Sequence, residues 1–195
     1  MFTTAARNNM IAAEGTTHVS AHTAYSSTGA NEVTGGSPAY ARRAQTFNAA
    51  ASEAKTASAT PTFDIPASTT VRWIGRWTAI TGGTFLGMEP NGGNEQEFSV
   101  DLTADTILEP AHGRAADSKV VFYGDTVPGG LVEGTVYFVR SPATDTYQVS
   151  ATAGGAAINL TSYPGRKCVV SSIVEEAFAS QGTLQLSSQT LRCDA

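Results

Sequence analysis

The sequence predicts a mainly β protein: an antiparallel β-sandwich-like domain with a short N-terminal helix and an inserted small β-barrel or sandwich module. Hydrophobic residues make up 41% of the 195 residues and charged residues only 15%, which is typical of folded chains. The 19 glycines and the many Ala, Thr and Ser residues favour short strands and tight turns over long helices. Short segments that alternate between apolar and polar residues recur along the chain.

The composition also argues against several classes of function. A net charge of −5 argues against a nucleic-acid partner, which would require a basic surface to neutralise phosphates. The adjacent basic pairs, Arg42-Arg43 and Arg166-Lys167, are interpreted as solvated surface residues. No window approaches the ~18 consecutive apolar residues of a membrane span, and no signal peptide is evident, so we expect synthesis in a cytoplasm without membrane insertion.

The first residues predict a short helix that begins at Thr3 or Thr4 and ends at Gly15. A helix of this length is not stable alone. We therefore expect Met10 and Ile11 to pack on the body of the protein or on a neighbouring subunit.

Alternating segments define the strands of the first module. Residues 17–23 predict a strand that places His18, Ser20 and His22 on one face, and residues 40–48 predict another. Residues 71–80 predict the clearest strand, with Trp73 and Trp77 on a core face, followed by a Gly-Gly hairpin into residues 84–88. Residues 49–60 are of low complexity and are expected to form a surface loop or an arm on a partner.

The sequence pattern changes after residue 97. Seven short strand-like segments separated by turn signals predict a small barrel or sandwich of its own. The segments are residues 98–102, 106–108, 119–123, 135–140, 146–151, 156–160 and 168–174. Residues 177–192 contain a further strand that is expected to pair back into the first module. The predicted division is therefore a discontinuous domain of residues 1–97 and 177–195 with an insert of residues 98–176.

Candidate reactive residues are few. The spacing of His18 and His22 suits a metal site on a helix, but in a strand it separates the two rings by roughly four residue rises. His112 is interpreted as a turn residue. Cys168 and Cys193 either pair or remain reduced as small apolar residues. No phosphate-binding loop, nucleophile elbow, zinc-binding Cys pair or dinucleotide fingerprint occurs, so we expect no catalytic residue, no metal and no cofactor.

Two further sets of side chains raise the possibility of carbohydrate chemistry. The first set contains aspartates that a glycoside hydrolase would use in pairs, although loop positions explain them better. Its members are Asp101, Asp105, Asp117, Asp125 and Asp145. The second set contains aromatic residues that could stack on sugars, although alternation favours a core or an interface. Its members are Trp73, Trp77, Tyr123, Tyr137 and Tyr147.

One group of motifs resembles a family of small tailed-phage structural proteins, the tail-fibre or minor tail proteins. The motifs are His22-Thr23, STGANEVTGG at residues 27–36, Tyr40-Ala41-Arg42, and TGGTFLG at residues 81–87. The segment Ala24-Tyr25-Ser26 departs from the ADP-like residues of the family, and residues 37–39 are slightly longer. The resemblance covers residues 3–97 and 177–192. It implies a virion structural protein, and the residues that we expect to contact another subunit or a partner are Met10, Ile11, Tyr40 and Arg42.

The insert resembles a β module that is common in phage virion proteins and is labelled after a half-domain of ubiquitin-activating enzymes. The matching runs include PAHG at residues 110–113, GLVEGTVYFV at 130–139, DTYQVS at 145–150 and GGAAINL at 154–160. No adenylation motif or catalytic Cys motif accompanies them, so the resemblance implies no enzymology.

The two resemblances imply a non-enzymatic protein at the tail tip or in a small fibre. It would form a homo-oligomer or join a baseplate protein, and it would contact the host surface. Two alternatives remain open: a capsid decoration protein that clamps major capsid subunits, and a carbohydrate-binding or carbohydrate-degrading tail protein that contacts a host glycan.

Overall fold

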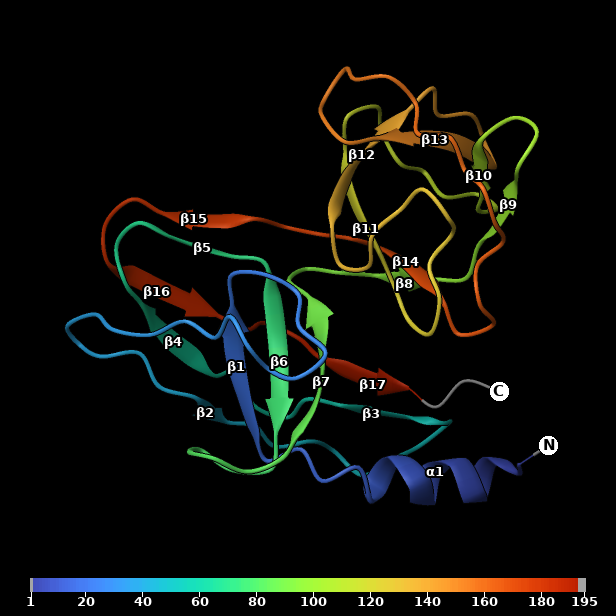
Figure 1. Ribbon diagram of the computed structural model, residues 1–195. Helices are drawn as coiled ribbons and strands as arrows, with labels where there is room; N and C mark the ends of the chain where they lie inside the picture. Colours follow the sequence, from blue (N-terminus) through green and yellow to red (C-terminus); the bar gives the residue numbers. More distant parts are fainter. Residues whose placement is uncertain (1, 193–195) are drawn as a thin grey trace. The chain divides into compact units, whose positions relative to one another are not determined.

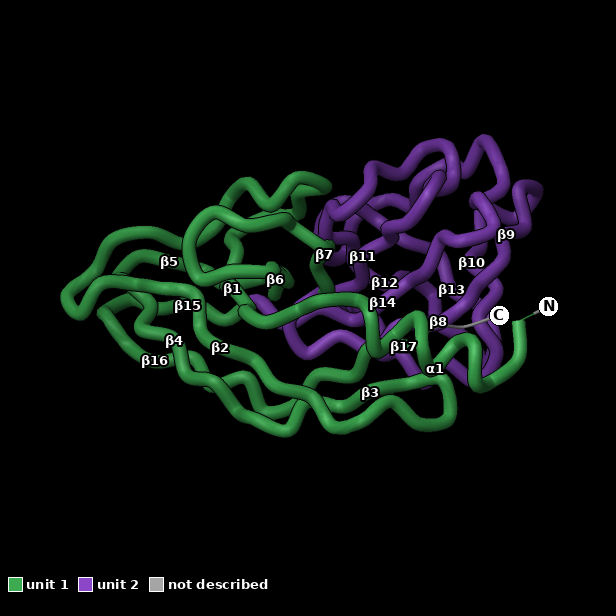
Figure 2. Tube along the Cα trace, turned by 90° about the horizontal axis from the view of Figure 1, so that it is seen from below, with its two compact units in different colours: residues 1–89, 176–195 green, residues 90–175 purple. Residues whose placement is uncertain are grey.

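The computed structural model describes residues 2–192 and divides the chain into two compact units. Unit 1 contains residues 1–89 and 176–195, and unit 2 contains residues 90–175 (Figure 2). Unit 1 is therefore discontinuous in sequence. Unit 2 begins at Pro90 rather than at Phe98, because β8 (Glu95–Gln96) pairs with a strand near the end of unit 2.

Helix α1 (Thr4–Ala12) opens the chain, as the sequence predicts (Figure 1). The Thr3 side chain accepts a hydrogen bond from the Ala6 N–H, which satisfies one of the free donors at the start of the helix. The chain turns away after Ala13, and Gly15 takes a positive φ of 83°. Thr3 and Gly15 thus mark the two ends of the helix.

The main sheet of unit 1 has the strand order β2-β1-β6-β7 (Figure 1). Its strands are β1 (His18–His22), β2 (Arg43–Ala44), β6 (Trp73–Trp77) and β7 (Phe85–Pro90). The antiparallel register of β1 on β6 sets Ser20 opposite Gly75 and His22 opposite Trp73. These residues therefore share one face of the sheet, while Val19, Ala21 and Ile74 occupy the other.

Both faces of this sheet are buried, which the sequence did not predict. The apolar cluster of unit 1 lies on the face of Val19 and Ile74, and the two tryptophans lie on the opposite face. The expected continuous strand of residues 71–80 is also wrong. Arg72 interrupts it, so that Val71 ends β5 (Thr69–Val71) and joins the apolar cluster, whereas Trp73 begins β6.

Three two-stranded antiparallel ladders complete unit 1, each joining an early segment to the returning chain. β15 (Glu176–Phe178) pairs with β5, β16 (Gly182–Gln185) with β4 (Thr62–Ile65), and β17 (Thr190–Arg192) with β3 (Ala54–Thr56). The low-complexity segment of residues 49–60 thus contains a strand, β3. Phe63 and Ile65 of β4 and Leu184 of β16 enter the apolar cluster of unit 1.

Unit 2 is a seven-stranded antiparallel sheet of order β8-β14-β11-β12-β13-β10-β9. Its other strands are β9 (Ser99–Asp101), β10 (Thr106–Leu108), β11 (Lys119–Tyr123), β12 (Val136–Arg140), β13 (Thr146–Ser150) and β14 (Val169–Ser172). Six of the seven expected segments contain a strand. The seventh, residues 156–160, does not.

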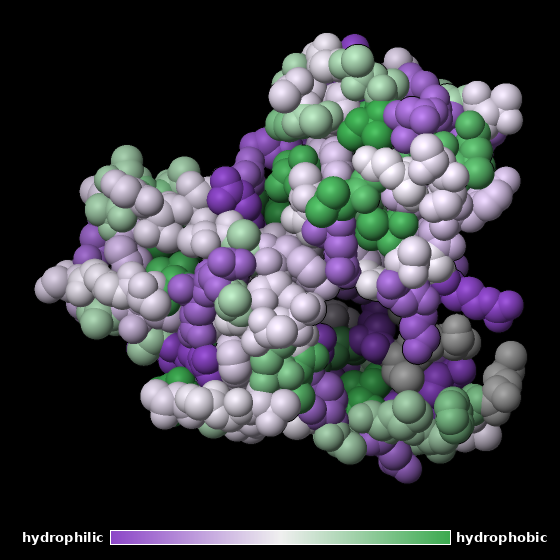
Figure 3. Space-filling model, in the orientation of Figure 1, coloured by the Kyte–Doolittle hydropathy of each residue, from purple (hydrophilic) through white to green (hydrophobic). Residues whose placement is uncertain are grey.

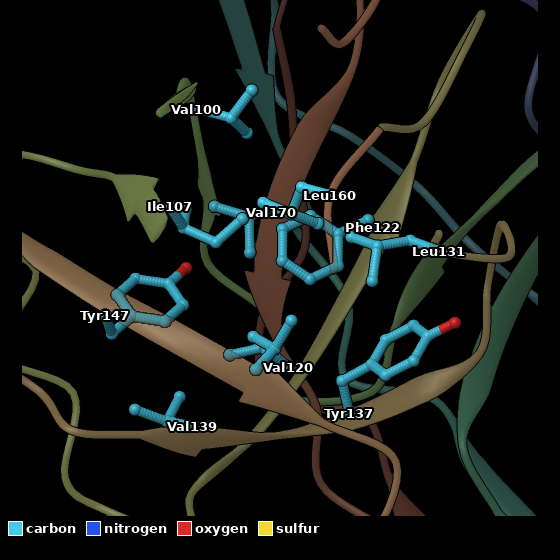
Figure 4. Packing of buried hydrophobic residues seen from close by; sticks show 11 residues of the cluster. Val100, Ile107, Val120, Phe122, Leu131, Tyr137, Val139, Tyr147, Leu160 and Val170 are labelled. Carbon is cyan, nitrogen blue, oxygen red and sulfur yellow. The ribbon is translucent and has the colours of Figure 1, made fainter. Parts of the chain in front are cut away.

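The sheet of unit 2 curls around a single core (Figure 4). Val100 of β9 and Val170 of β14 stand near opposite ends of the strand order, yet both belong to the same buried cluster. Phe122 lies near the middle of this cluster, and Tyr147 and Tyr137 lie on opposite sides of it. Unit 2 therefore has the architecture of a small, open barrel with its own core.

Candidate functional site

The loop of residues 23–38 covers the tryptophan face of the main sheet in unit 1. Gly29, with a φ of 82°, packs so tightly that a Cβ there would lie 2.5 Å from the Trp77 ring and 2.9 Å from the Phe85 ring. The Ser26 hydroxyl accepts hydrogen bonds from the backbone N–H groups of Thr28 (3.1 Å) and Ala30 (2.9 Å). The loop is thus held by its own backbone and by aromatic contacts.

A buried chain of hydrogen bonds joins this loop to the sheet. The Trp77 indole N–H donates to Ser20 Oγ at 2.8 Å, and Ser20 Oγ lies 2.7 Å from His22 Nε2. His22 Nδ1 lies 2.8 Å from the Ala30 carbonyl, which can only accept, so Nδ1 carries the proton and Nε2 accepts from Ser20. Burial lowers the pKa of His22 and keeps the ring neutral.

Arg42 fixes the far end of the loop. Its guanidinium donates to both carboxylate oxygens of Glu32, at 3.0 Å from Nε and 2.8 Å from Nη2, and stacks 3.3 Å from the centre of a Trp77 ring. Nη1 donates to the carbonyls of Ala79 (3.3 Å) and Gly82 (2.7 Å) in the β6–β7 turn. One side chain therefore connects the loop, β6 and its turn.

Tyr40 supports the same arrangement from the side of the apolar cluster. Its hydroxyl accepts the Ala21 N–H at 2.8 Å and donates to Glu32 at 3.3 Å, and its ring stacks on Phe63. Burial raises the pKa of Tyr40. Tyr40 and Arg42, the residues expected to contact a partner, are thus both engaged within unit 1. Arg42 is also no solvated surface residue.

Beside this cluster lies a shallow groove of about 470 Å³, mostly apolar. Glu32, Val33, Tyr40 and Arg42 form one part of its lining, and the β6–β7 turn forms another. Ile80 in that turn is 53% exposed and adds apolar surface to the groove. The groove has rigid walls because Arg42 bonds to both sides of it.

The structure separates the two helix residues that were predicted to contact a partner. Ile11 is only 5% exposed, and thus packs on the body of unit 1. Met10 is 50% exposed. The helix is held to the turn before β3, where Thr4 and Arg7 donate to the Glu53 carboxylate and Asn8 Oδ1 accepts the Glu53 N–H.

Glu14 ties the end of this helical segment to two strands. Its carboxylate accepts from Arg76 of β6 at 2.8 Å, from Lys55 of β3 at 3.2 Å and from Thr16. Burial alone would raise the pKa of Glu14, but the hydrogen bonds from Thr16, the charge of Arg76 and the hydrogen bond from Lys55 outweigh it and lower the pKa. Sequence reasoning missed this cluster because its members are far apart along the chain.

The remaining His, Cys and Asp candidates do not form a common site within the described residues. Within residues 2–192, no three His, Cys, Asp or Glu side chains are placed to hold a metal ion. Cys168 is buried, which raises its pKa to about 12, and Cys193 lies outside the described residues. Three of the aspartates accept backbone N–H groups across loops: Asp105 from Leu160, Asp117 from Gly154 and Asp145 from Ala111.

The five aromatic residues considered for sugar stacking are buried, as the alternation favours. All five rings are buried, at 8% exposure or less, and therefore offer no open face to a ligand. They serve the two cores and the tryptophan face of the sheet instead. Figure 3 shows hydrophobic residues exposed on the viewed face of unit 2, and the large exposed hydrophobic residues of this unit include Val132, Tyr163 and Val174. Across residues 2–192, no helix is both long and apolar enough to cross a membrane.

Residues 1–96 match the model of a family described as Podophage GP4 fiber I protein gp80. No curated protein and no solved structure matched the chain. The matched segment contains α1, the main sheet of unit 1 and the whole groove beside Arg42. The first 96 residues are therefore similar to a podophage fibre protein, and this similarity supports a phage tail-fibre structural protein that is part of the virion and associates with other virion proteins.

Proposed function

We propose that the chain is a non-enzymatic component of a phage tail fibre or tail tip that joins other virion subunits, copies of itself included, through unit 1. The match of residues 1–96 to a fibre family carries this proposal. The surface chemistry of unit 1 supports it, because Ile80 at the groove and Met10 on α1 both expose apolar area in a region whose backbone is firmly held. Covering such area stabilises a contact by about 25 cal/mol per Å².

The location is tested by quantitative mass spectrometry of purified virions of the phage that encodes the chain. A tail component occurs in numbers comparable to other tail proteins, and antibody labelling marks the tail in electron micrographs. Numbers comparable to the major capsid protein, with label over the head, would identify a capsid decoration protein instead. Absence of the chain from particles would refute the proposal.

The contact itself is tested at Ile80. The variant Ile80→Asp places a charge in the groove without touching the Arg42 bonds, so the chain folds but enters particles poorly. Ile80→Val keeps an apolar side chain at the same site and serves as the matched control. Normal incorporation of Ile80→Asp would remove the groove from the proposed interface.

A further inference from the structure

Unit 2 contains a polar pocket of about 380 Å³ that neither core uses. Asn94, Gln96, Glu109, His112, Arg114 and Ser172 are among the residues that line it. Gln96 pairs in register with Val170, a core residue of β14, and Ser172 lies two residues further on the same strand. Both therefore belong to the inner face of the curled sheet, and the pocket occupies one end of the barrel interior. The ends of small β-barrels are common ligand sites.

The floor of the pocket is a buried pair of opposite charges. Arg114 donates through Nε and Nη2 to the two oxygens of Glu109, at 2.8 Å and 2.9 Å, and their side chains are 7% and 3% exposed. The Tyr147 hydroxyl donates to Glu109 at 2.8 Å, and Arg114 Nη1 donates to Ser172 Oγ at 3.1 Å. Burying such a pair is expensive unless the surrounding hydrogen bonds are complete. Here they fix a rigid polar surface at the base of the pocket.

The wall beside this floor is also fixed. The backbone N–H of Arg114 donates to His112 Nδ1 at 2.9 Å, so the proton resides on Nε2, 3.3 Å from the Thr146 carbonyl. The His112 ring packs edge-on against Tyr147. The imidazole is thus an oriented part of the lining.

The charges around the pocket compensate one another. Arg114 is paired with Glu109, and Lys119, the other cation in the lining, is paired with Glu175. An ionic ligand would have to compete with these carboxylates. The groups left at the open rim are the exposed carboxamides of Asn94 and Gln96, which both donate and accept hydrogen bonds.

We propose that this pocket binds an uncharged polyhydroxyl ligand, a neutral saccharide unit. Sugar hydroxyls also both donate and accept, which matches carboxamide and hydroxyl side chains and does not require a net charge. The pocket volume is at the low end for small-ligand sites, which suits a single sugar unit at the end or side of a glycan. The inference rests on the geometry of unit 2 and does not depend on the proposed assembly through unit 1.

The test is saturation-transfer NMR on the purified full chain with glucose, galactose, mannose and N-acetylglucosamine, and with glucuronate as a charged counterpart. We expect transfer to at least one neutral sugar, and a polymer of that sugar should compete with it. In the double variant Asn94→Ala, Gln96→Ala the affinity should fall about tenfold, because two hydrogen bonds are lost from an exposed rim. Asn159→Ala, an exposed carboxamide of unit 2 that does not line the pocket, should bind like the parent.

Three results would overturn the assignment. No transfer to any neutral sugar at millimolar concentrations would exclude the ligand class. Transfer to glucuronate with all neutral sugars silent would show that the pocket selects an anion. Equal binding by the parent and the double variant would place the sugar elsewhere on the chain.

Discussion

At the residue scale, Arg42 shows that the sequence can identify an important residue without revealing its partners. The sequence places it in a pair of adjacent basic residues on an acidic protein. The structure pairs Arg42 with Glu32, ten positions earlier, and Arg43 with Asp64, twenty-one positions later. Neither partner is visible from local spacing, because the intervening loop decides which residues meet. The planar guanidinium is required here for its geometry more than for its charge.

Arg42→Lys should therefore destabilise unit 1 by about 2 to 3 kcal/mol, because an ammonium cannot replace the bidentate contact with Glu32 and the stacking on Trp77. Both tryptophans of the chain lie in unit 1, so their fluorescence during denaturant unfolding reports on this unit. Arg166→Lys, an exposed position in unit 2, should leave the transition within about 0.5 kcal/mol of the parent. A parent-like transition for Arg42→Lys would show that charge alone suffices.

His22 predicts a second, pH-dependent effect. Burial lowers its pKa in the folded state below the usual value of about 6.5, so the unfolded chain binds the proton first as pH falls. The stability contributed by neutral His22 is complete above about pH 6.5 and declines as the pH drops below it. The charges nearest the ring, Glu32 and Arg42, act in opposite directions on this pKa. Unfolding midpoints of unit 1 measured between pH 7.5 and 5 should therefore fall with pH.

The variant His22→Asn tests the assignment, since its amide can donate to the Ala30 carbonyl but does not titrate. It should be less stable than the parent at pH 7.5, and its unfolding midpoint should change much less with pH. The variant His18→Gln should keep the pH dependence of the parent. Glu14, whose pKa is lowered, stabilises the fold fully above about pH 4.5 and loses this stabilisation only as the pH falls below that value, so it does not affect the range from pH 7.5 to 5. A pH dependence unchanged in His22→Asn would assign the acid sensitivity to another group.

At the element scale, local patterns identified strands that alternate clearly, even where their partners are distant in sequence, as for β1 with β6 and β11 with β14. Six strands of unit 2 and the helix α1 follow from alternation, turn residues and capping. Residues 156–160 alternate too, but there Ile158 donates to Val149 and no ladder forms. In contrast, β3 and β4 were missed. β3 is the segment Ala54–Thr56, which lies in a stretch rich in Ala, Ser and Thr without apolar alternation, and the partners of β3 and β4, β17 and β16, follow unit 2 in the chain.

In helix α1, Ile11 is buried and Met10 is exposed, so variants at these two positions distinguish an effect on folding from an effect on assembly. Ile11→Asp buries a charge and should destabilise unit 1 by about 3 kcal/mol or more. Met10→Asp removes an exposed apolar side chain and should leave stability nearly unchanged while reducing incorporation into particles. Asn9→Asp adds the same charge one position away without removing apolar area, and should incorporate normally. Equal incorporation of Met10→Asp and Asn9→Asp would exclude the helix from the interface.

At the scale of the whole molecule, the two ends of unit 2 lie next to each other in space although they are far apart in the sequence. The Val174 N–H donates to the Asn91 carbonyl at 2.8 Å, and the Asn91 side chain donates back to the Val174 carbonyl at 3.4 Å. The second and the second-to-last residues of unit 2 are thus bonded to each other, which holds its two ends together. The strands β15, β16 and β17 that follow find their partners inside unit 1. This is the geometry of an insertion that the host domain can tolerate.

We therefore expect the chain to fold without residues 90–175 when Glu89 is joined to Glu176 by a short Gly-Ser linker. The three ladders and the main sheet retain all of their strands, apart from Pro90 at the end of β7, and closing a short loop costs less entropy than closing one that contains unit 2. Tryptophan fluorescence should keep its buried character, and unfolding should remain cooperative. The shortened chain should enter particles, since the groove and α1 are intact, but should lose the sugar binding proposed for unit 2. If the shortened chain is unfolded, unit 1 depends on unit 2 for its stability, and the two units are not an independent host and insert.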